Sequence, residues 1–373
     1  MDDRDAQVGW TEAQWNRVRE EVLRAWQRVR VAGSFLPVYG PLPPSTQVVP
    51  SEVLKPDGTV DEQATTRLLE ISLPVRLTRQ QVREEDLSSA LLQFRRRATQ
   101  VGQLEDWYIF NGTHPSGEFA VEPVLQGDEE AGRSPAVYLP SSPFVKEVSR
   151  AWPVLRGAPE PIADAAMWRL GSLLRDPGAL GLLEAARQRL KEPEREARGQ
   201  GGRRSELEVE DRSIRRRELG NQGLMETTVE AMNTLENNGH VTPYVCVYGQ
   251  RPFQEAHSPV GDSTAFPRDR LEPLIGRELL HASAIDIVPL GTADDAVGER
   301  WTRRGLLLSL ADDAVDLAIA TQATPEFMQV DAQGRYLFSV FERFALRIKD
   351  PSAMVYLEFE ESERGRRAGP TRP

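Results

Sequence analysis

Side chains that commonly carry out chemistry are few in this sequence and stand apart from one another. The four histidines and the single cysteine occur singly, as His114, His240, His257, His281 and Cys246. No spacing typical of a dinucleotide loop, a phosphate loop, a nucleophile elbow, a zinc-protease helix or a CxxC pair is found. A lone histidine is more often structural than a metal ligand, and a cysteine inside an apolar run is most simply a small hydrophobe. The sequence therefore predicts no catalytic residue, no metal site and no enzyme.

Composition narrows the class of protein further. The chain has 373 residues, enough for two or three domains, and a formal net charge of −11. That charge argues against a general nucleic-acid binder, whose affinity would come from a basic surface. The acidic start, MDDRDAQ, does not resemble a signal peptide, and no apolar run is long enough to cross a bilayer. With one cysteine and no such segments, a cytoplasmic protein without membrane contact is expected.

The first predicted element is an amphipathic helix over Thr11–Arg30. Thr11 and Gln14 form a capping box, and Trp10 and Trp15 occupy the two positions of a hydrophobic staple. Apolar residues then recur every three or four positions, at Trp15, Val18, Val22, Trp26 and Val29. This pattern predicts a helix that packs one apolar stripe against its own domain.

A proline-rich segment and a second long helix follow. The turn Pro56-Asp57-Gly58 lies between two predicted strands, Val48–Leu54 and Leu68–Leu77, which we expect to form an extended hairpin. Asp86 or Ser88 is expected to cap the second helix, which ends before Gly112. Its buried stripe would be Leu87, Leu91, Phe94, Ala98, Val101 and Leu104.

The last third of the chain alternates as β-strands do. Asp331–Gly334 supplies a turn between Phe327–Val330 and a long strand that starts at Tyr336 and is expected to bend or bulge near Glu342 and Arg343. Met354–Phe359 is expected to form a final strand. Upstream, the pattern predicts a helix ended by Asn237-Asn238-Gly239, a buried strand, a further helix and another strand. The last three are placed at Tyr244–Tyr248, Arg268–Leu280 and Ile285–Val288.

Several short motifs, in order along the chain, resemble those of the encapsulins, which are bacterial nanocompartment shell proteins. The matching segments are Thr11–Trp15, Phe35–Pro41, Ser72–Pro74, Asp86–Ser89, Gly239–Val247, Asp316–Ile319 and Asp350–Phe359. The likeness covers residues 10–126 and 222–360. It implies an α+β fold of the Hong Kong 97 phage capsid type, with a peripheral domain built on a long spine helix, an extension loop and an axial domain.

The resemblance also implies a layout along the chain. The N-terminal helix and arm of the peripheral domain occupy 1–40, the extension loop 41–85, and the rest of the peripheral domain with its spine helix 86–126. A mainly helical insert with a charged linker follows over 127–221, and then the axial domain over 222–298. Strands shared by both domains occupy 299–360, and a flexible tail occupies 361–373. The insert has no counterpart in the family. We expect it to decorate the outer surface or to contact a second shell component.

By this resemblance, the chain would self-assemble into an icosahedral shell that encloses a cargo enzyme. Cargo in this family is commonly a ferritin-like protein or a dye-decolorising peroxidase and carries a C-terminal targeting peptide. The segment 75–85 lacks the tryptophan found there in the family, so flavin is not expected and no cofactor is predicted. A major capsid protein of a tailed phage or prophage that packages DNA remains the alternative, and an enzyme is the weakest one.

Two sets of residues would then matter most. Exposed members of Trp26, Val29, Phe35 and Val38 would bind the cargo peptide, although each of them could equally fill the domain's own core. Ser258, Gly261, Asp262, Ser263 and Thr264 would belong to the loop at the five-fold pore. His257 and Asp262 could meet their symmetry mates there.

Overall fold

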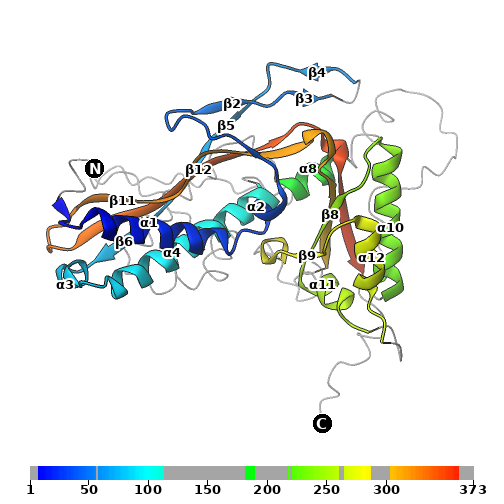
Figure 1. Ribbon diagram of the computed structural model, residues 1–373. Coiled ribbons are helices and arrows are strands. Elements are labelled where there is room, and N and C mark those ends of the chain that lie inside the picture. Colours follow the sequence, from blue (N-terminus) through cyan, green and yellow to red (C-terminus); the bar gives the residue numbers. More distant parts are fainter. Residues whose placement is uncertain are drawn as a thin grey trace, which may run out of the picture.

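The computed structural model describes residues 7–55, 58–112, 181–189, 217–218, 221–259, 264–286 and 303–360. They form two layered bodies, an elongated one that contains the N-terminal helix and an upright one beside it (Figure 1). Helices and strands occur in both, so the fold is α+β, as predicted. Within these ranges, no helix is both long and apolar enough to span a bilayer.

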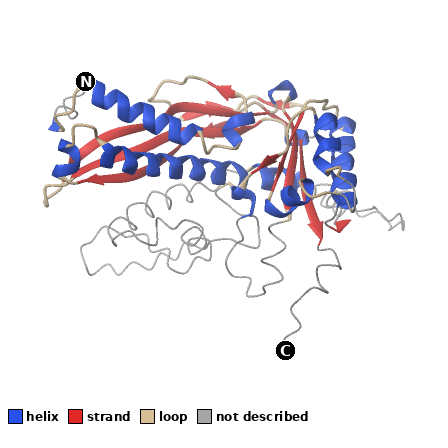
Figure 2. Cartoon of the chain, turned by 60° about the horizontal axis from the view of Figure 1, so that its bottom comes forward, coloured by secondary structure: helices blue, strands red, loops and turns tan. Residues whose placement is uncertain are grey.

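The elongated body is a four-stranded sheet with two long helices along one face (Figure 2). The strands, in spatial order, are β1 (Val38–Tyr39), β11 (Val315–Val330), β12 (Tyr336–Ile348) and β6 (Leu69–Leu77). The helices are α1 (Glu12–Gln27) and α4 (Ser88–Asn111), with the short α2 (Ala32–Phe35) and α3 (Arg79–Arg83) beside them. The sheet is antiparallel except for β1, which pairs parallel with β11.

Aromatic rings fill the space between the helices and the sheet. Phe338 on β12 stacks on Trp10 with 5.2 Å between ring centroids, and it meets Phe94 of α4 edge-on at 5.4 Å. Trp15 of α1 and Phe327 of β11 contact the same ring. Because these five rings come from four segments, Phe338 joins the N-terminal helix, α4 and the two central strands of the sheet in one core.

The capping residues predicted for α1 and α4 agree with the structure to different degrees. The predicted capping box is confirmed, since the Thr11 hydroxyl accepts from the Gln14 N–H and the Gln14 side chain accepts from the Thr11 N–H. The N-cap position of α4 is Leu87, in a left-handed conformation with φ 53°, rather than the predicted Asp86 or Ser88. The predicted Asp86 carboxylate still caps the first turn, since it accepts from the Ser88 N–H at 3.3 Å, and Glu84 accepts from the Ser89 N–H at 3.0 Å.

The predicted hairpin of the last third is confirmed. Asp331 accepts from the N–H groups of Gln333 and Arg335, which closes the turn between β11 and β12. The expected irregularity lies in β11 rather than in β12. Three register shifts place extra residues in β11, the first of them opposite the Arg343–Phe344 step of β12. β12 therefore stays continuous, with one face toward α1 and α4 and the other away from them.

The upright body is a second sheet flanked by helices. Its strands, in spatial order, are β7 (Arg217–Glu218), β13 (Met354–Glu360), β10 (Arg304–Ser309), β8 (Tyr244–Tyr248) and β9 (Leu280–His281). The helices are α10 (Asn221–Asn237), α11 (Gln250–Ala256) and α12 (Pro267–Ile275), with 3-10 turns at Ser283–Asp286, Ala311–Asp313 and Pro351–Ala353. The predicted strand Tyr244–Tyr248 is confirmed, and Cys246 in it is fully buried.

Three expectations for this body need correction. Helix α11 follows β8 and was not predicted. Helix α12 ends at Ile275 because Gly276 takes a left-handed conformation with φ 81°, so the helix stops short of the predicted Leu280. Residues Ser283–Asp286 form a 3-10 turn where a strand was expected to begin at Ile285.

The predicted hairpin after the N-terminal arm is present, with a different second half. Strand β2 (Val48–Pro50) pairs with β5 (Thr65–Arg67), and β3 (Val53–Leu54) pairs with β4 (Val60–Asp61). The segment Leu69–Leu77, expected in this hairpin, instead pairs with β12 as an edge strand of the large sheet. Its apolar residues alternate toward the helix-covered face, and that burial outweighs pairing in an exposed ribbon.

Most of the predicted insert and the whole predicted tail 361–373 lie outside the described residues. Of the insert, the elements that the structure describes are α8 (Leu182–Arg189), β7 and the first residue of α10. Helix α8 packs against α4, and Leu182 and Ala186 are buried in the large core.

Replacing Phe338 with alanine tests the role of this core. F338A should lower the free energy of unfolding by about 3–5 kcal/mol, because a large buried ring is removed from between four other rings. Chemical denaturation of the purified chain measures this. Leu92→Ala is the matched control, since Leu92 is largely exposed on α4 and its loss should change stability by less than about 0.5 kcal/mol. Equal effects of both variants would contradict a core organised by Phe338.

Candidate functional site

The hairpin formed by β2–β5 and β3–β4 lies above the large sheet in Figure 1, and the Leu54 N–H donates to the Lys349 carbonyl at 2.7 Å. A two-stranded ribbon is marginally stable in water without a further layer. Its apolar contact with the large sheet is small, a cluster of Val49 and Leu68 with Ala318 and Ala345. Three of its other apolar side chains are exposed, Val48 at 49%, Leu54 at 37% and Val60 at 52%. An extended segment with so little apolar support is suited to contact another molecule.

Two arginines of β12 hold the base of this hairpin. Arg343 donates to the carbonyls of Pro44 and Thr46, and Arg347 donates to the carbonyl of Pro50 at 2.9 Å. Pro44 and Thr46 lie in the segment that leads from β1 into the hairpin, and Pro50 lies in β2, the first strand of the hairpin. Hydrogen bonds from a guanidinium are directional and stronger than neutral ones, so these contacts fix the angle at which the hairpin leaves the sheet.

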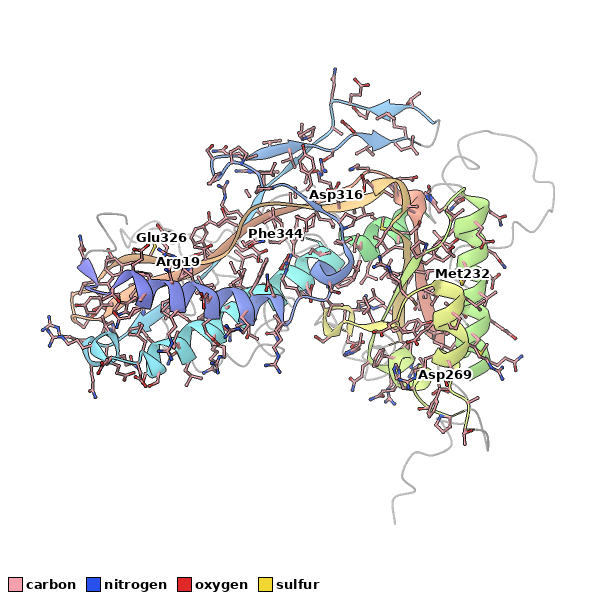
Figure 3. All side chains as sticks on the ribbon, in the orientation of Figure 1. Arg19, Met232, Asp269, Asp316, Glu326 and Phe344 are labelled. Carbon is pink, nitrogen blue, oxygen red and sulfur yellow. The ribbon has the colours of Figure 1, made fainter. Side chains whose placement is uncertain are left out.

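A buried ion pair fixes the second arginine in turn. Arg347 donates to both carboxylate oxygens of Asp316, each at 2.6 Å, and Lys349 reaches the same carboxylate at 2.9 Å. Asp316 lies on β11 at the base of the hairpin (Figure 3). The Arg347 guanidinium also covers the Tyr39 ring at 3.8 Å. Breaking such a buried pair leaves an uncompensated charge, so this anchor resists distortion.

Strand β1 extends the exposed apolar surface from the hairpin onto the edge of the sheet. Val38 is 56% exposed and Tyr39 is 42% exposed, although both pair with β11 through their backbones. We call Val38, Tyr39, Val48, Leu54 and Val60 the exposed apolar set. All five lie within one stretch of 23 positions, between the first helices and β5.

The four predicted cargo-peptide residues do not form one exposed surface. Trp26 and Phe35 are buried in the large core, so they fill the domain itself. Val29 is half-buried and Val38 is exposed. Since only exposed members could bind a peptide, the hypothesis now concerns Val29 and Val38 alone.

The predicted pore loop is described only at its two ends. Ser258 donates to the Gln254 carbonyl at 2.8 Å and so closes the end of α11, and Thr264 is exposed. Gly261, Asp262 and Ser263 lie outside the described residues. The predicted meeting of His257 and Asp262 with symmetry mates therefore stays a prediction.

The histidines that the structure describes have structural partners. His240 bonds to the Ser352 hydroxyl at 2.7 Å, which ties the end of α10 to the turn before β13. His257 and His281 both lie against the Phe253 ring, with centroids 4.2 Å and 5.2 Å away. Over the described ranges, no three histidine, cysteine or acidic side chains converge as a metal site would require.

A buried charge cluster lies under the end of α1, and the sequence analysis did not anticipate it. Glu105 accepts two hydrogen bonds from Arg30, and Asp106 accepts from the N–H groups of Val31 and Ala32 at 2.7 and 2.9 Å. Glu342 accepts from the indole N–H of Trp26 at 2.9 Å. We call Arg30, Glu105, Asp106 and Glu342 the acid cluster. A signal for it existed, since strict alternation from Phe338 to Leu346 places Glu342 on the inward face.

Burial dominates the electrostatics of the acid cluster. It raises the pKa of Asp106 to about 7, despite the two backbone donors. Burial and the neighbouring Glu105 charge raise the pKa of Glu342 well above its usual value. Glu105 has the Arg30 guanidinium as a direct partner, so we assign the negative charge to Glu105 and the proton to Glu342.

Comparison with known proteins identifies the fold. No protein-family model and no curated protein sequence match the chain. Among solved structures, the virus-like particle from Pyrococcus furiosus is similar at 11% identity, over 93% of this chain and 100% of that one, with a TM-score of 0.53. The chain has the Hong Kong 97-type capsid fold. The predicted fold class is therefore confirmed, with α4 as the spine helix and the β2–β5 hairpin as the extension loop.

Other capsid-type structures match at lower scores. An encapsulin complex from Synechococcus elongatus is similar at 10% identity, over 89% of this chain and 88% of that one, with a TM-score of 0.45. The capsid of a Myoviridae phage is similar at 10% identity, over 80% of this chain and 75% of that one, with a TM-score of 0.41.

Removing one arginine tests whether β12 holds the extension loop. Arg343→Ala should speed amide hydrogen exchange in residues 44–50 roughly tenfold, because a charge-assisted hydrogen bond contributes about 1.5–3 kcal/mol. Exchange in α4 should not change. Arg96→Ala, on the exposed face of α4, is the matched control. Unchanged exchange in residues 44–50 of R343A would show that other contacts set the loop.

Proposed function

We propose that this chain is the structural protein of an encapsulin-type shell, whose copies assemble into a closed icosahedral compartment around a cargo enzyme. The observation that carries the proposal is the extension loop, held rigidly at its base and left with exposed apolar residues along its length. Such a loop buries those residues only if it reaches onto a second copy. The fold, shared with a virus-like particle, supports the same assembly.

The edges of the large sheet favour assembly through the loop rather than through strand addition. Over the described residues, β6 forms one edge and the second half of β11 the other, and an unprotected edge pairs readily with another chain. Pro74 interrupts the first edge, while Pro325 and three register shifts interrupt the second. Irregular edges of this kind prevent open-ended pairing, whereas repeated contacts of one loop with one neighbour can close into a shell.

The remaining parts of the proposal follow the family resemblance. The shell would take up its cargo through a C-terminal targeting peptide bound near Val29 and Val38, and residues 258–264 would line the five-fold pore. The insert 127–221 would decorate the outer surface or contact a second shell component. We propose no catalytic role and a cytoplasmic location.

Packaging of DNA, as in a tailed-phage capsid, is the competing function for the same fold. The net charge of −11 favours a protein cargo, since a wall that faces packaged DNA is usually basic.

Electron microscopy of the full chain expressed alone tests the proposal. We expect closed, uniform icosahedral particles whose absorbance spectrum after nuclease treatment is that of protein. A monodisperse monomer or small oligomer would contradict self-assembly. Particles that retain long protected DNA would favour the phage-type capsid instead.

Charge on the extension loop should block assembly without unfolding the chain. Val48→Asp combined with Val60→Asp should abolish particles, because two carboxylates would be buried unpaired in the contact with the neighbour. Circular dichroism should stay unchanged, since both positions are exposed in the single chain. Leu92→Asp, exposed on α4, is the matched control and should still assemble. Wild-type particle yield from the double variant would rule out the loop as the main contact.

Cargo loading tests the narrowed peptide site. Co-expression with a protein that carries an encapsulin-type targeting peptide should give loaded particles, and Val29→Glu or Val38→Glu should lower loading severalfold while particles still form. The ratio of cargo to shell protein in purified particles measures this. Loading equal to wild type in both variants would remove Val29 and Val38 from the site.

A further inference from the structure

Four segments meet at the acid cluster, and each contributes at least one polar or charged group. Trp26 comes from the end of α1, Arg30 from the connection to α2, Glu105 and Asp106 from α4, and Glu342 from β12. Glu105 and Glu342 are fully buried, and Asp106 is 5% exposed. Three carboxyl groups therefore face a single guanidinium. The cluster cannot be neutral with all three ionised.

Hydrogen bonding requires at least one proton on the carboxyls. Oε2 of Glu342 accepts from Trp26, but its buried Oε1 meets no N–H or O–H donor within the described part of the chain. The Glu105 carboxyl lies beside it, within hydrogen-bonding reach. Two carboxylates repel each other, whereas a protonated Glu342 donates to Glu105 while Glu105 still accepts from Arg30. One proton thus completes a continuous chain from Trp26 through Glu342 and Glu105 to Arg30.

The other charges near this chain do not replace that proton. Asp106 is a third acid that already accepts from Val31 and Ala32, so it adds negative charge. Arg343 follows Glu342 on β12 but points to the opposite face, where it bonds the carbonyls of Pro44 and Thr46. Arg30 lies 3.8 Å over the Trp26 ring and is occupied by Glu105. Among the described residues, Arg30 is therefore the cation available to offset the negative charge that a rise in pH adds to the cluster.

We propose that the proton shared by Glu342 and Glu105 is a latch that fastens the end of α1, and with it α2 and β1, to the spine helix and β12, and that rising pH releases it. The direction follows from the raised pKa values of Glu342 and Asp106. In the unfolded chain, carboxyls lose their protons near pH 4, whereas the cluster keeps them to higher pH. The stabilisation is complete below about pH 4 and is lost as the pH rises through the folded values, near 7 for Asp106.

Release would act on the exposed apolar set. The chain runs from Arg30 through α2 directly into β1, which holds Val38 and Tyr39 against β11 by backbone pairing over two residues. A loosened α2 removes the support on the N-terminal side of that pairing. This coupling deepens the proposed shell function, while the latch itself can be measured whether or not particles form.

Glu342→Gln provides the decisive variant. The amide oxygen can accept from Trp26 and the NH2 group can donate to Glu105, so glutamine reproduces the protonated acid but cannot ionise. Hydrogen exchange of the full chain, corrected for the intrinsic effect of pH, should show protection in residues 22–39 falling at least tenfold from pH 6 to pH 9 in the wild type. E342Q should be at least as well protected as the wild type at pH 6, where the carboxyl of the opened wild-type chain is already ionised, and should keep its protection at pH 9.

Glu20→Gln is the matched control, because it removes one carboxylate from the exposed face of the same helix. It should follow the wild type at every pH. A wild type without pH dependence, or parallel loss of protection in wild type and E342Q, would overturn the proposal. So would an E342Q chain that is less protected than wild type, or unfolded, at pH 6, since Glu342 would then act as an ionised partner of Arg30. None of these readouts depends on particle assembly, which separates failure of the latch from failure of the proposed shell.

Discussion

The alternation of side chains along β12 is the constraint on which the rest of the structure depends. One face of this strand carries Phe338, Val340 and Phe344 into the core under α1 and α4. The other face carries Arg343 and Arg347 to the carbonyls at the base of the extension loop. Because successive residues point to opposite faces, packing of the core and placement of the loop share one rigid backbone. A shift of one residue in register would lose both together.

This arrangement divides the molecule into a part whose apolar residues are buried within the chain and a part whose apolar residues stay exposed. The core around Phe338 buries aromatic rings from four segments. The extension loop buries little and is positioned by directional polar contacts instead. Apolar packing tolerates small changes in angle, but hydrogen bonds from a guanidinium to fixed carbonyls do so less. In a shell whose curvature repeats from subunit to subunit, the loop that connects subunits must leave its own sheet at a fixed angle. Directional hydrogen bonds at the base of the loop supply that constraint.

The structural features that could be predicted from the sequence are those set by residues close together along the chain. The capping box of Thr11 and Gln14, the Asp331 turn and the glycine stop at Gly239 are set within a few residues, and each is present. The motifs in order along the chain also predicted the capsid fold. The predicted pairing partner of Leu68–Leu77 was wrong, because β6 pairs with β12, which lies more than 250 positions away, and no local pattern encodes that contact.

The predicted cargo-peptide residues show the same limit of local sequence patterns. Trp26 and Phe35 are apolar and helix-linked, which fits a groove and a core equally well in sequence, and only the packed structure places them in the core. Glu342, with Arg343, was expected to lie where the strand bends or bulges. Its partners, Trp26 and Glu105, lie in other segments far along the chain, so the buried cluster could not be derived from spacing alone.

The energetics of the two charged regions point to different roles. Buried ionic groups are often no more stabilising than well-packed apolar residues of similar size, because desolvation offsets their attraction. Around Asp316, two cations match one carboxylate and the loop carbonyls take the remaining donors, which suits a fixed anchor. In the acid cluster, three carboxyls face one cation. An apolar residue at Glu342 would fill the same space without that excess, so we infer that the cluster serves a response to protons rather than stability.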